Sequence, residues 1–277
     1  DNLNNYKNSS EMGMSYRLGV DVGGTFTDLL LINEETGETH TAKVPSTPDD
    51  SSIGVLNGVA QICDESGINP KDVNRVMHGT TVATNAVLTG KGAKVGLVTT
   101  SGYEDTLQVA RSFCSGGLGG WVSFIKRPLL APLELTIGAK ERIGADGVVV
   151  QILDEAQLRN DLKTLHSKGE VEALTICFIN SYTNSTHEKR AMEIAKEIFT
   201  DTPISISSDV VPEMQEYERT ETTVVNSYVR PEVASYVSNL QNVLDNKMGS
   251  DTQLSILRSD GGLSSARAAA ESPVNML

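Results

Sequence analysis

The sequence predicts an α/β protein whose first sheet opens with a β-meander. An apolar run, Tyr16–Val22, ends at the pair Gly23-Gly24, and a second run, Thr25–Ile32, follows at once. A third run, Thr39–Val44, comes after a polar turn. Runs joined through a glycine pair are typical of antiparallel strands, whereas a dinucleotide-binding fold passes from its glycine turn into a helix. Helical and strand patterns then alternate, which indicates an α/β fold.

The remaining elements follow from periodicity and from capping residues. A helix is expected over residues 50–66, with cap residues before it and Gly67 after it. Residues 112–132 are rich in Gly and Pro and predict a long loop. A long helix over 221–246 should break or kink at Pro231. The other predicted strands are 73–78, 94–99, 171–178, 204–207 and 254–257, and the other predicted helices are 80–88, 154–168 and 184–199.

The net charge of −13 limits the partners of the chain. A strongly acidic surface repels nucleic-acid phosphates and anionic membranes, so we expect neither nucleic acid nor membrane as a partner. The hydrophobic fraction of 39% is enough for a packed core. Backbone N–H groups can still bind an anion, because such a site needs no net positive charge.

Cysteine and histidine usage indicates a reducing compartment. Cys63, Cys114 and Cys177 stand far apart and in no metal-ligand spacing, so reduced thiols in a cytoplasmic protein are expected. The four histidines form no paired-ligand pattern. No apolar run is long enough to span a bilayer, and the polar residues 1–15 are expected to be a disordered tail or a cloning remnant.

The strongest local signal is the run Gly19–Asp28, which reads Gly-Val-Asp-Val-Gly-Gly-Thr-Phe-Thr-Asp. A turn with two glycines can present N–H groups to a phosphate without a Cβ in the way, and Thr25 and Thr27 add hydroxyl donors. Asp21, at the end of the first strand, can hold Mg²⁺ or its waters beside that phosphate. An ordinary glycine hairpin is the alternative, but the whole run between apolar strands favours a phosphate site.

The run His78-Gly79-Thr80-Thr81 is a second candidate site. A strand delivers His78 to a tight glycine turn, and a helix begins directly afterwards. The helix N–H groups would point at a ligand, and His78 could act in acid–base chemistry or polarise a carbonyl. Equally open is helix capping by Thr80 or Thr81, with His78 packed and hydrogen-bonded.

Three further segments have plainer interpretations. The mixed-charge run Glu216–Thr222 favours a solvated helix face. The run Ser259–Gly262 favours a capped turn over a second backbone loop facing a cleft. Arg111 and the loop Gly116–Trp121 could form a substrate lid, but a surface loop is the more ordinary interpretation.

Together these motifs resemble those of the hydantoinase A / 5-oxoprolinase family over nearly all of residues 16–277. That family includes ATP-dependent 5-oxoprolinases, N-methylhydantoinases, a lactam hydrolase, and subunits of acetone and acetophenone carboxylases. Its first lobe resembles the actin-like ATPase (ribonuclease H-like) fold, which agrees with the meander opening. The motifs occur in the order seen in the family: Gly19–Asp28, His78–Ala86, Thr99–Asp105, Glu141–Ile143, Glu216–Arg219 and Ser259–Gly262.

The resemblance implies an ATP-dependent chemistry and roles for the motif residues. ATP would phosphorylate the oxygen of a cyclic amide (lactam, hydantoin or 5-oxoproline) or of an enolate, and hydrolysis or carboxylation would follow. By motif, Asp21 would act in catalysis by handling Mg²⁺, and His78 would be a second catalytic residue. The phosphates and the cleft between the lobes would be lined by Gly23, Gly24, Thr25, Thr27, Gly79, Thr80 and Thr81.

The resemblance also implies domains and partners. Residues 16–200 would form the hydantoinase/oxoprolinase N-terminal domain, with a second α/β segment, and residues 201–277 the truncated start of a hydantoinase A domain. The expected partners are a cyclic amide or ketone substrate and a hydantoinase B-type subunit or fused domain, in an oligomer.

Two departures from the family pattern change what is expected. Where many members carry an Arg-rich segment followed by Leu-Tyr-Asp-Leu, this chain has Arg111–Trp121, so the substrate of the oxoprolinases is not carried over. The family normally adds a second Asp-x-Gly-Gly-Thr loop, which these 277 residues do not contain. We therefore expect weak or no ATP turnover by this chain alone.

Two other functions stay open at this point. A sugar or acyl kinase of the same superfamily would share the phosphate loop, although the runs that begin at His78 and Glu216 fit it poorly. A non-catalytic binding module, made of one truncated lobe, is the other alternative.

Overall fold

The computed structural model describes residues 15–47, 51–112, 119–120, 127–249 and 251–277. The chain divides into two compact units. The first comprises residues 1–85, 233–271 and 275–277, and the second comprises residues 86–232 and 272–274. These units differ from the sequence division at residue 200, because the first is built from segments far apart in the chain.

A mixed sheet of six strands forms the first unit, in the order β12-β11-β4-β1-β2-β3. The meander β1-β2-β3 is antiparallel, β4 and β11 run parallel to β1, and β12 returns antiparallel. The strands are β1 (Tyr16–Val22), β2 (Phe26–Asn33), β3 (Thr39–Pro45), β4 (Val73–Thr80), β11 (Gln253–Leu257) and β12 (Leu263–Ser265). The predicted meander and α/β class are thus confirmed.

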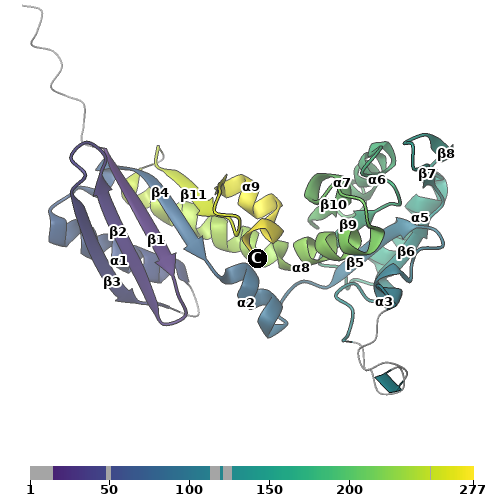
Figure 1. Cartoon of the computed structure of the whole chain (residues 1–277), viewed down its shortest axis with the longest axis horizontal. Helices are drawn as coiled ribbons and strands as arrows, with labels where there is room; N and C mark the ends of the chain where they lie inside the picture. The colour runs from purple at the N-terminus through teal and green to yellow at the C-terminus, as the bar shows by residue number, and fades with distance from the viewer. Residues whose placement is uncertain (1–14, 48–50, 113–118, 121–126, 250) are drawn as a thin grey trace, which may run out of the picture. The chain divides into compact units, whose positions relative to one another are not determined.

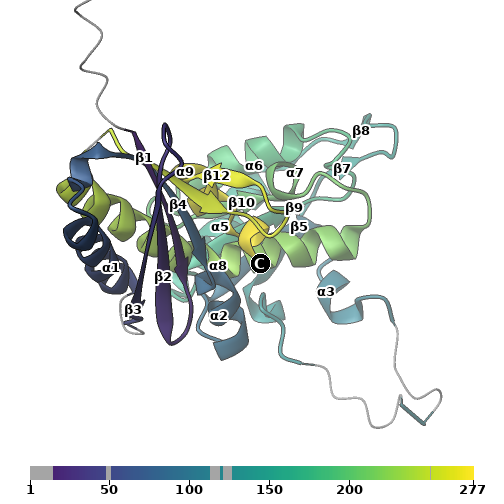
Figure 2. The same cartoon turned by 60° about the vertical axis from the view of Figure 1, so that its left-hand side comes forward.

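One face of this sheet is covered by two helices, α1 (Ser51–Ser66) and the later half of α8 (Glu216–Met248). Val20 pairs with Leu29 of β2 and with His78 of β4, so these three side chains share a face. Helix α1 lies against Leu29, because a Cβ at Gly58 would come within 2.2 Å of its Cδ1. Figures 1 and 2 show α1 along the meander, and Tyr236 of α8 contacts His78 on the same face.

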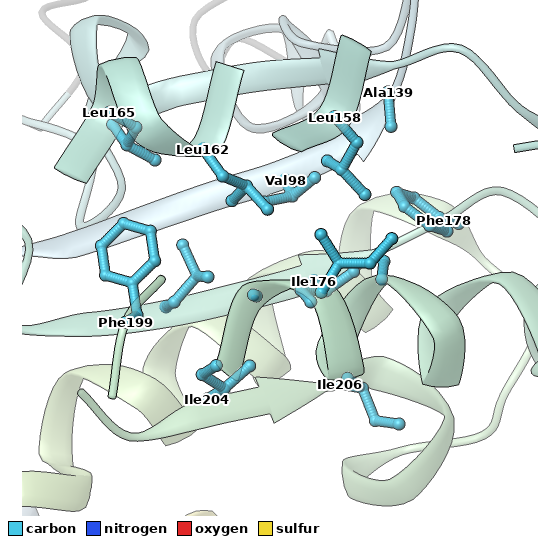
Figure 3. Packing of buried hydrophobic residues seen from close by; sticks show 14 of the residues in the cluster. Val98, Ala139, Leu158, Leu162, Leu165, Ile176, Phe178, Phe199, Ile204 and Ile206 are labelled. Atoms are coloured by element: carbon cyan, nitrogen blue, oxygen red, sulfur yellow. The ribbon is translucent and has the colours of Figure 1, made fainter. Parts of the chain in front are cut away.

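A parallel sheet of four strands forms the second unit, in the order β10-β9-β5-β6. The strands are β5 (Val95–Thr100), β6 (Thr136–Ala139), β9 (Ala173–Cys177) and β10 (Ile204–Ile206), and the helices α5 (Glu155–Ser167) and α6 (Thr186–Lys196) pack on it. Figure 3 shows the leucines of α5 packed with Val98, Ile176 and Phe199 in the hydrophobic core of this unit. Burial on both faces explains why β5 and β9 are mainly apolar and contain no charged residue.

Short elements complete the described chain. They are α2 (Val82–Thr89), α3 (Thr106–Val109), α7 (Ser207–Val210), α9 (Ala266–Glu271), β7 (Arg142–Ile143), β8 (Val149–Gln151), and the 3₁₀ turns η1 (Pro70–Asp72), η2 (Leu133–Leu135) and η3 (Pro273–Met276). The sequence did not predict β6, β7, β8 or β12, because runs of two to four residues carry little periodicity.

Two expectations about local structure need comment. Helix α8 includes Pro231 in its interior, so the break that was one of the two predicted outcomes is absent. The boundary between the compact units falls just after this proline, between Glu232 and Val233. The predicted loop at 112–132 lies largely outside the described residues, as do Cys114 and most of the possible lid. Within the described part of the chain, no helix is long and apolar enough to cross a membrane.

Candidate functional site

The glycine hairpin lies at the end of β1, where an anion can approach its backbone. The Gly23 N–H donates to the Phe26 carbonyl at 3.0 Å, and Gly24 and Thr25 form the exposed tip. A Cβ on Gly23 would meet the Phe26 oxygen at 3.0 Å, so this position favours glycine. A Cβ on Gly24 would meet nothing within 4 Å, which leaves the space in front of the tip open.

Ser46, directly after β3, holds this hairpin in place. Its hydroxyl donates to the Gly23 carbonyl at 2.7 Å, and its N–H donates to the Thr25 carbonyl at 2.9 Å. The Thr27 hydroxyl lies 3.0 Å from the Ser46 hydroxyl. Thr27 itself is fully buried, so its side chain braces the hairpin from behind and does not reach the exposed tip.

Asp21 lies on the face of the sheet opposite α1 and α8, and its side chain is exposed. In register it stands beside Asp28 of β2 and Gly79 of β4. Among the described residues, no three or more His, Cys, Asp or Glu side chains gather into a metal-binding group. Since Mg²⁺ is commonly held by one or two carboxylates with phosphate oxygens and waters, a lone exposed carboxylate beside the hairpin fits a nucleotide-bound Mg²⁺.

A cavity of about 900 Å³ adjoins Asp21 on this uncovered face. Its rim includes Asp28 and Lys43, whose carboxylate oxygen and ammonium nitrogen are 2.7 Å apart. Within the described chain Asp21 forms no ion pair, so it supplies the uncompensated negative charge. The apolar lining consists mainly of Leu30, Met77, Leu257 and Leu263.

His78 points to the helix-covered face, away from this cavity. Its side chain is fully buried, and Nε2 lies 2.7 Å from the Tyr236 hydroxyl. Burial lowers the pKa of His78 from 6.5 to about 4, against a smaller raising effect of the Val20 backbone. The imidazole is therefore neutral at pH 7, and its geometry favours the packed, hydrogen-bonded interpretation, while a catalytic role stays a prediction.

The turn that follows His78 begins helix α2 as expected. Gly79 lines the cavity beside Asp21, whereas Thr80 accepts a bond from the Val82 N–H at 3.3 Å. The Thr81 carbonyl accepts from the Asn85 N–H at 2.8 Å. The structure thus brings Gly79 to Asp21 and gives Thr80 a capping contact.

The run Ser259–Gly262, the remaining motif of the first unit, forms a turn. Gly261, with a φ of +83°, allows the chain to reverse between β11 and β12, and the Gly262 N–H donates to Asp260 at 2.9 Å. This is the capped turn that the sequence favours.

Three other motifs meet at the carboxyl edge of the second sheet. Arg219 is buried, and its guanidinium donates to the Phe178 and Glu213 carbonyls at 2.7 and 3.0 Å. The prediction of a solvated face for Glu216–Thr222 is therefore wrong at Arg219, whose planar fork satisfies one carbonyl just after β9 and one just before α8. Nearby, the Thr100 hydroxyl donates to Glu141.

Arg111 also belongs to this edge. Its Nε donates to Glu218 at 2.7 Å, and the pair lowers the pKa of that carboxyl. Both side chains are about half exposed, so the pair contributes little to stability.

Comparison with known proteins identifies the lineage of the chain. The hydantoinase/oxoprolinase N-terminal region matches residues 17–199, and the hydantoinase/oxoprolinase domain matches residues 219–277. The chain belongs to the hydantoinase/oxoprolinase family. Caprolactamase subunit alpha of Pseudomonas jessenii is 34% identical over 266 residues, which are 95% of this chain and 38% of that protein.

Other members of the hydantoinase/oxoprolinase family are similarly related. The acetophenone carboxylase gamma subunit of Aromatoleum aromaticum is 35% identical over 77% of this chain and 31% of its own length. The nucleotide-free structure from work on ATP-dependent acetone carboxylation matches with a TM-score of 0.82 at 25% identity, over 94% of this chain and 38% of that one. The ATP-dependent caprolactamase structure matches with a TM-score of 0.81 at 32% identity and the same coverage.

These matches confirm the family and the predicted actin-like ATPase type of α/β fold. The chain spans 38% of the caprolactamase subunit, a little over a third of its length. Relatives described as subunits of caprolactamase and acetophenone carboxylase show that family members work within larger assemblies.

Two residues of the site were missed by sequence reasoning. Ser46 stands more than twenty residues after Gly23 and carries no motif of its own, so only the pairing of β2 with β3 places it under the hairpin. Tyr236 lies in the middle of α8, where nothing in the local sequence indicates a partner for His78.

Proposed function

We propose that this chain is the Mg·ATP-binding N-terminal part of an enzyme that phosphorylates the oxygen of a cyclic amide or an enolate. The observation that carries this proposal is the open glycine hairpin at Gly23 and Gly24, with the exposed carboxylate of Asp21 beside it. The ATP-dependent relatives support the use of ATP. Bound ATP would supply the phosphoryl group that turns an amide oxygen into a leaving group.

The residues of the chain would divide the work around the phosphates. Backbone N–H groups of Gly24 and Phe26 would bind the phosphate oxygens, and the Thr25 hydroxyl would add a donor. Asp21 would hold Mg²⁺ directly or through waters. Thr27 would act indirectly, because its buried hydroxyl bonds to Ser46.

The cavity beside Asp21 is the proposed place of the acceptor substrate. Its apolar lining suits a hydrocarbon ring, and the Asp28–Lys43 pair leaves only the charge of Asp21 uncompensated. Without Mg²⁺, an acceptor with its own carboxylate would be repelled by that charge, whereas bound Mg²⁺ would offset it. Because the lining is mainly apolar, we propose an uncharged cyclic amide or ketone over a carboxylated one.

Partner and location follow from different observations. Relatives named as subunits support a partner subunit of hydantoinase B type, or a fused equivalent, in an oligomer.

Cys63 and Cys177 are free, buried thiols, and burial raises the pKa of both. Protonated, unpaired thiols support a reducing compartment such as the cytoplasm.

Binding of Mg·ATP tests the proposal directly. Titration calorimetry should show binding to the purified chain that is lost when EDTA removes Mg²⁺. Asp21→Asn should weaken Mg·ATP by at least about tenfold, about 1.4 kcal/mol, and abolish the dependence on Mg²⁺. Asp64→Asn removes an exposed carboxylate from α1 and serves as the charge control. Equal affinities for the wild type and Asp21→Asn would remove the metal role of Asp21.

Turnover provides a second test. The chain contains the Asp-x-Gly-Gly-Thr run once, so it should bind ATP and release phosphate at or near the blank rate, with lactams, hydantoins or sugars present. Rapid phosphate release with a sugar alone would favour a kinase instead.

A further inference from the structure

Ser46 contacts both sides of the glycine hairpin although it belongs to neither of its strands. It follows β3 directly, and its N–H and its hydroxyl donate to the Thr25 and Gly23 carbonyls, at 2.9 and 2.7 Å. We propose that Ser46 is a positioning residue that aims the N–H groups of Gly24 and Phe26 at the phosphates of the nucleotide. This inference rests on the proposed function of the hairpin.

Because peptide groups are planar, the directions of the Gly23 and Thr25 carbonyls also fix the directions of the N–H groups that follow them. In a trans peptide the C=O and the following N–H point in opposite directions within one plane. The Gly23 carbonyl points at Ser46, so the Gly24 N–H points away from it. The Thr25 carbonyl also points at Ser46, so the Phe26 N–H likewise points away. One residue thereby sets the rotation of two peptide planes.

Both N–H groups are available to a ligand. In a closed two-residue hairpin the Phe26 N–H would donate to the Gly23 carbonyl, but here only the reverse bond, from the Gly23 N–H to the Phe26 carbonyl, is present within the described residues. The Gly23 carbonyl is instead bonded to Ser46. The turn is therefore open, and Ser46 occupies the acceptor that would otherwise take the Phe26 N–H.

Thr27 fixes the direction of the Ser46 hydroxyl. A hydroxyl has one proton to donate, and that of Ser46 goes to the Gly23 carbonyl at 2.7 Å. In the 3.0 Å contact between the two hydroxyls, Thr27 must then be the donor. Because Thr27 is fully buried, its end of this chain of two hydrogen bonds is protected from water.

If Ser46 only supported the fold, its substitution would lower stability without changing ligand affinity, and a control residue can show that pattern. Thr252 is a suitable comparison, because its hydroxyl is also buried in the first unit and donates to a backbone carbonyl, that of Val73, at 3.1 Å. Val73 is the first residue of β4, whereas the cavity and the hairpin adjoin the other end of that strand. Thr252→Val should therefore cost stability without changing ligand affinity.

The test measures affinity and stability on the same variants. Calorimetry with Mg·ATP and with Mg·tripolyphosphate is combined with thermal unfolding for the wild type, Ser46→Ala, Ser46→Thr, Ser46→Val and Thr252→Val. The Thr and Val variants at residue 46 are nearly the same shape and differ in the hydroxyl. We expect Ser46→Ala and Ser46→Val to weaken both ligands about tenfold, because the oriented N–H groups contact phosphate and not the base. Ser46→Thr should bind severalfold more tightly than Ser46→Val.

Each result decides the matter. If Ser46→Ala and Ser46→Val melt lower, as Thr252→Val does, but bind both ligands like the wild type, Ser46 only supports the fold and the inference fails while the proposed function stands. If Ser46→Ala does not fold, the comparison of Ser46→Thr with Ser46→Val gives the answer. If the wild-type chain binds neither ligand, the proposed function fails and the inference with it.

Discussion

Gly79 lies directly against Asp21: a Cβ at position 79 would stand 3.4 Å from the Asp21 Oδ1 atom. The two residues are register partners on neighbouring parallel strands, and both line the same cavity. A single methyl group fits at this distance, whereas a branched side chain must displace the carboxylate or fill the space in front of it. Gly79, from the run that begins at His78, therefore leaves room for the carboxylate of Asp21.

Gly79→Val should weaken Mg·ATP binding by about tenfold, since it crowds the carboxylate proposed to hold Mg²⁺. Gly79→Ala should bind within about twofold of the wild type, because a methyl group makes ordinary van der Waals contact there. Titration calorimetry at fixed Mg²⁺ measures both variants. Valine and alanine variants with equal affinities would show that the approach of Gly79 to Asp21 has no bearing on the nucleotide.

The neutrality of His78 predicts a pH-dependent loss of stability. Its pKa is lowered by burial from 6.5 to about 4, and Tyr236 is the titratable group that faces it in the described chain. Between these pH values the unfolded chain binds a proton that the folded chain does not, so stability falls as pH falls through this window. The loss amounts to about 3 kcal/mol by pH 4.

His78→Gln should remove this part of the pH dependence, because glutamine can still accept from Tyr236 and does not titrate. Urea unfolding of both proteins at pH 7, 5 and 4, followed by circular dichroism, measures the difference. Carboxylates shared by the two proteins cancel in the comparison. Parallel stability curves for the wild type and His78→Gln would contradict a buried, neutral histidine.

Much of the first unit could be predicted from the sequence, because its strands alternate clearly. The predicted run Tyr16–Val22 is β1 to the residue, and the glycine pair marks the turn. The alternation of side chains along β4 also accounts for the side of the sheet on which His78 lies. Val76 and His78 are buried, while Met77 and Gly79 are only partly covered. The short strands β6, β7, β8 and β12 could not be found this way, because they are formed by pairing with neighbours and not by local preference.

The turn of the candidate site could be predicted from the sequence, whereas the residues that contact it from other elements could not. The hairpin and Asp21 are carried by adjacent residues, and the sequence shows them directly. Ser46 and Tyr236 act across strands and helices, so their roles depend on register and packing that a single sequence does not display. Arg219 was misassigned because a charged residue at helical spacing is usually solvated, whereas here three acceptors outside α8 explain its burial.

The charge of the cavity predicts selectivity between ring substrates. Without Mg²⁺, caprolactam, an uncharged lactam, should bind to the chain, whereas the 5-oxoproline anion should bind at least about tenfold more weakly, because no cation then offsets the charge of Asp21. Saturation-transfer NMR with each compound measures this. Leu257→Asp adds a second uncompensated charge to the apolar lining and should weaken caprolactam binding. Tighter binding of 5-oxoproline than of caprolactam would show that the cavity is not an uncharged-ring site.

Because the guanidinium of Arg219 is buried, we expect that a lysine at this position, which keeps the positive charge, cannot restore the stability lost when the arginine is removed. Its three nitrogens donate in different directions, to the Ser207 hydroxyl and to the Glu213 and Phe178 carbonyls. Arg219→Met should lower the stability of the second unit by about 3 kcal/mol or more, because all three acceptors lose their charged donor. Arg219→Lys should recover little, since one ammonium cannot reach all three acceptors in the fork geometry. Hydrogen exchange of amides in β9 and β10 measures the loss locally, with Arg267→Lys, at an exposed arginine of α9, as the matched control. A lysine variant as protected as the wild type would mean that positive charge, and not the planar fork, is what this edge of the sheet requires.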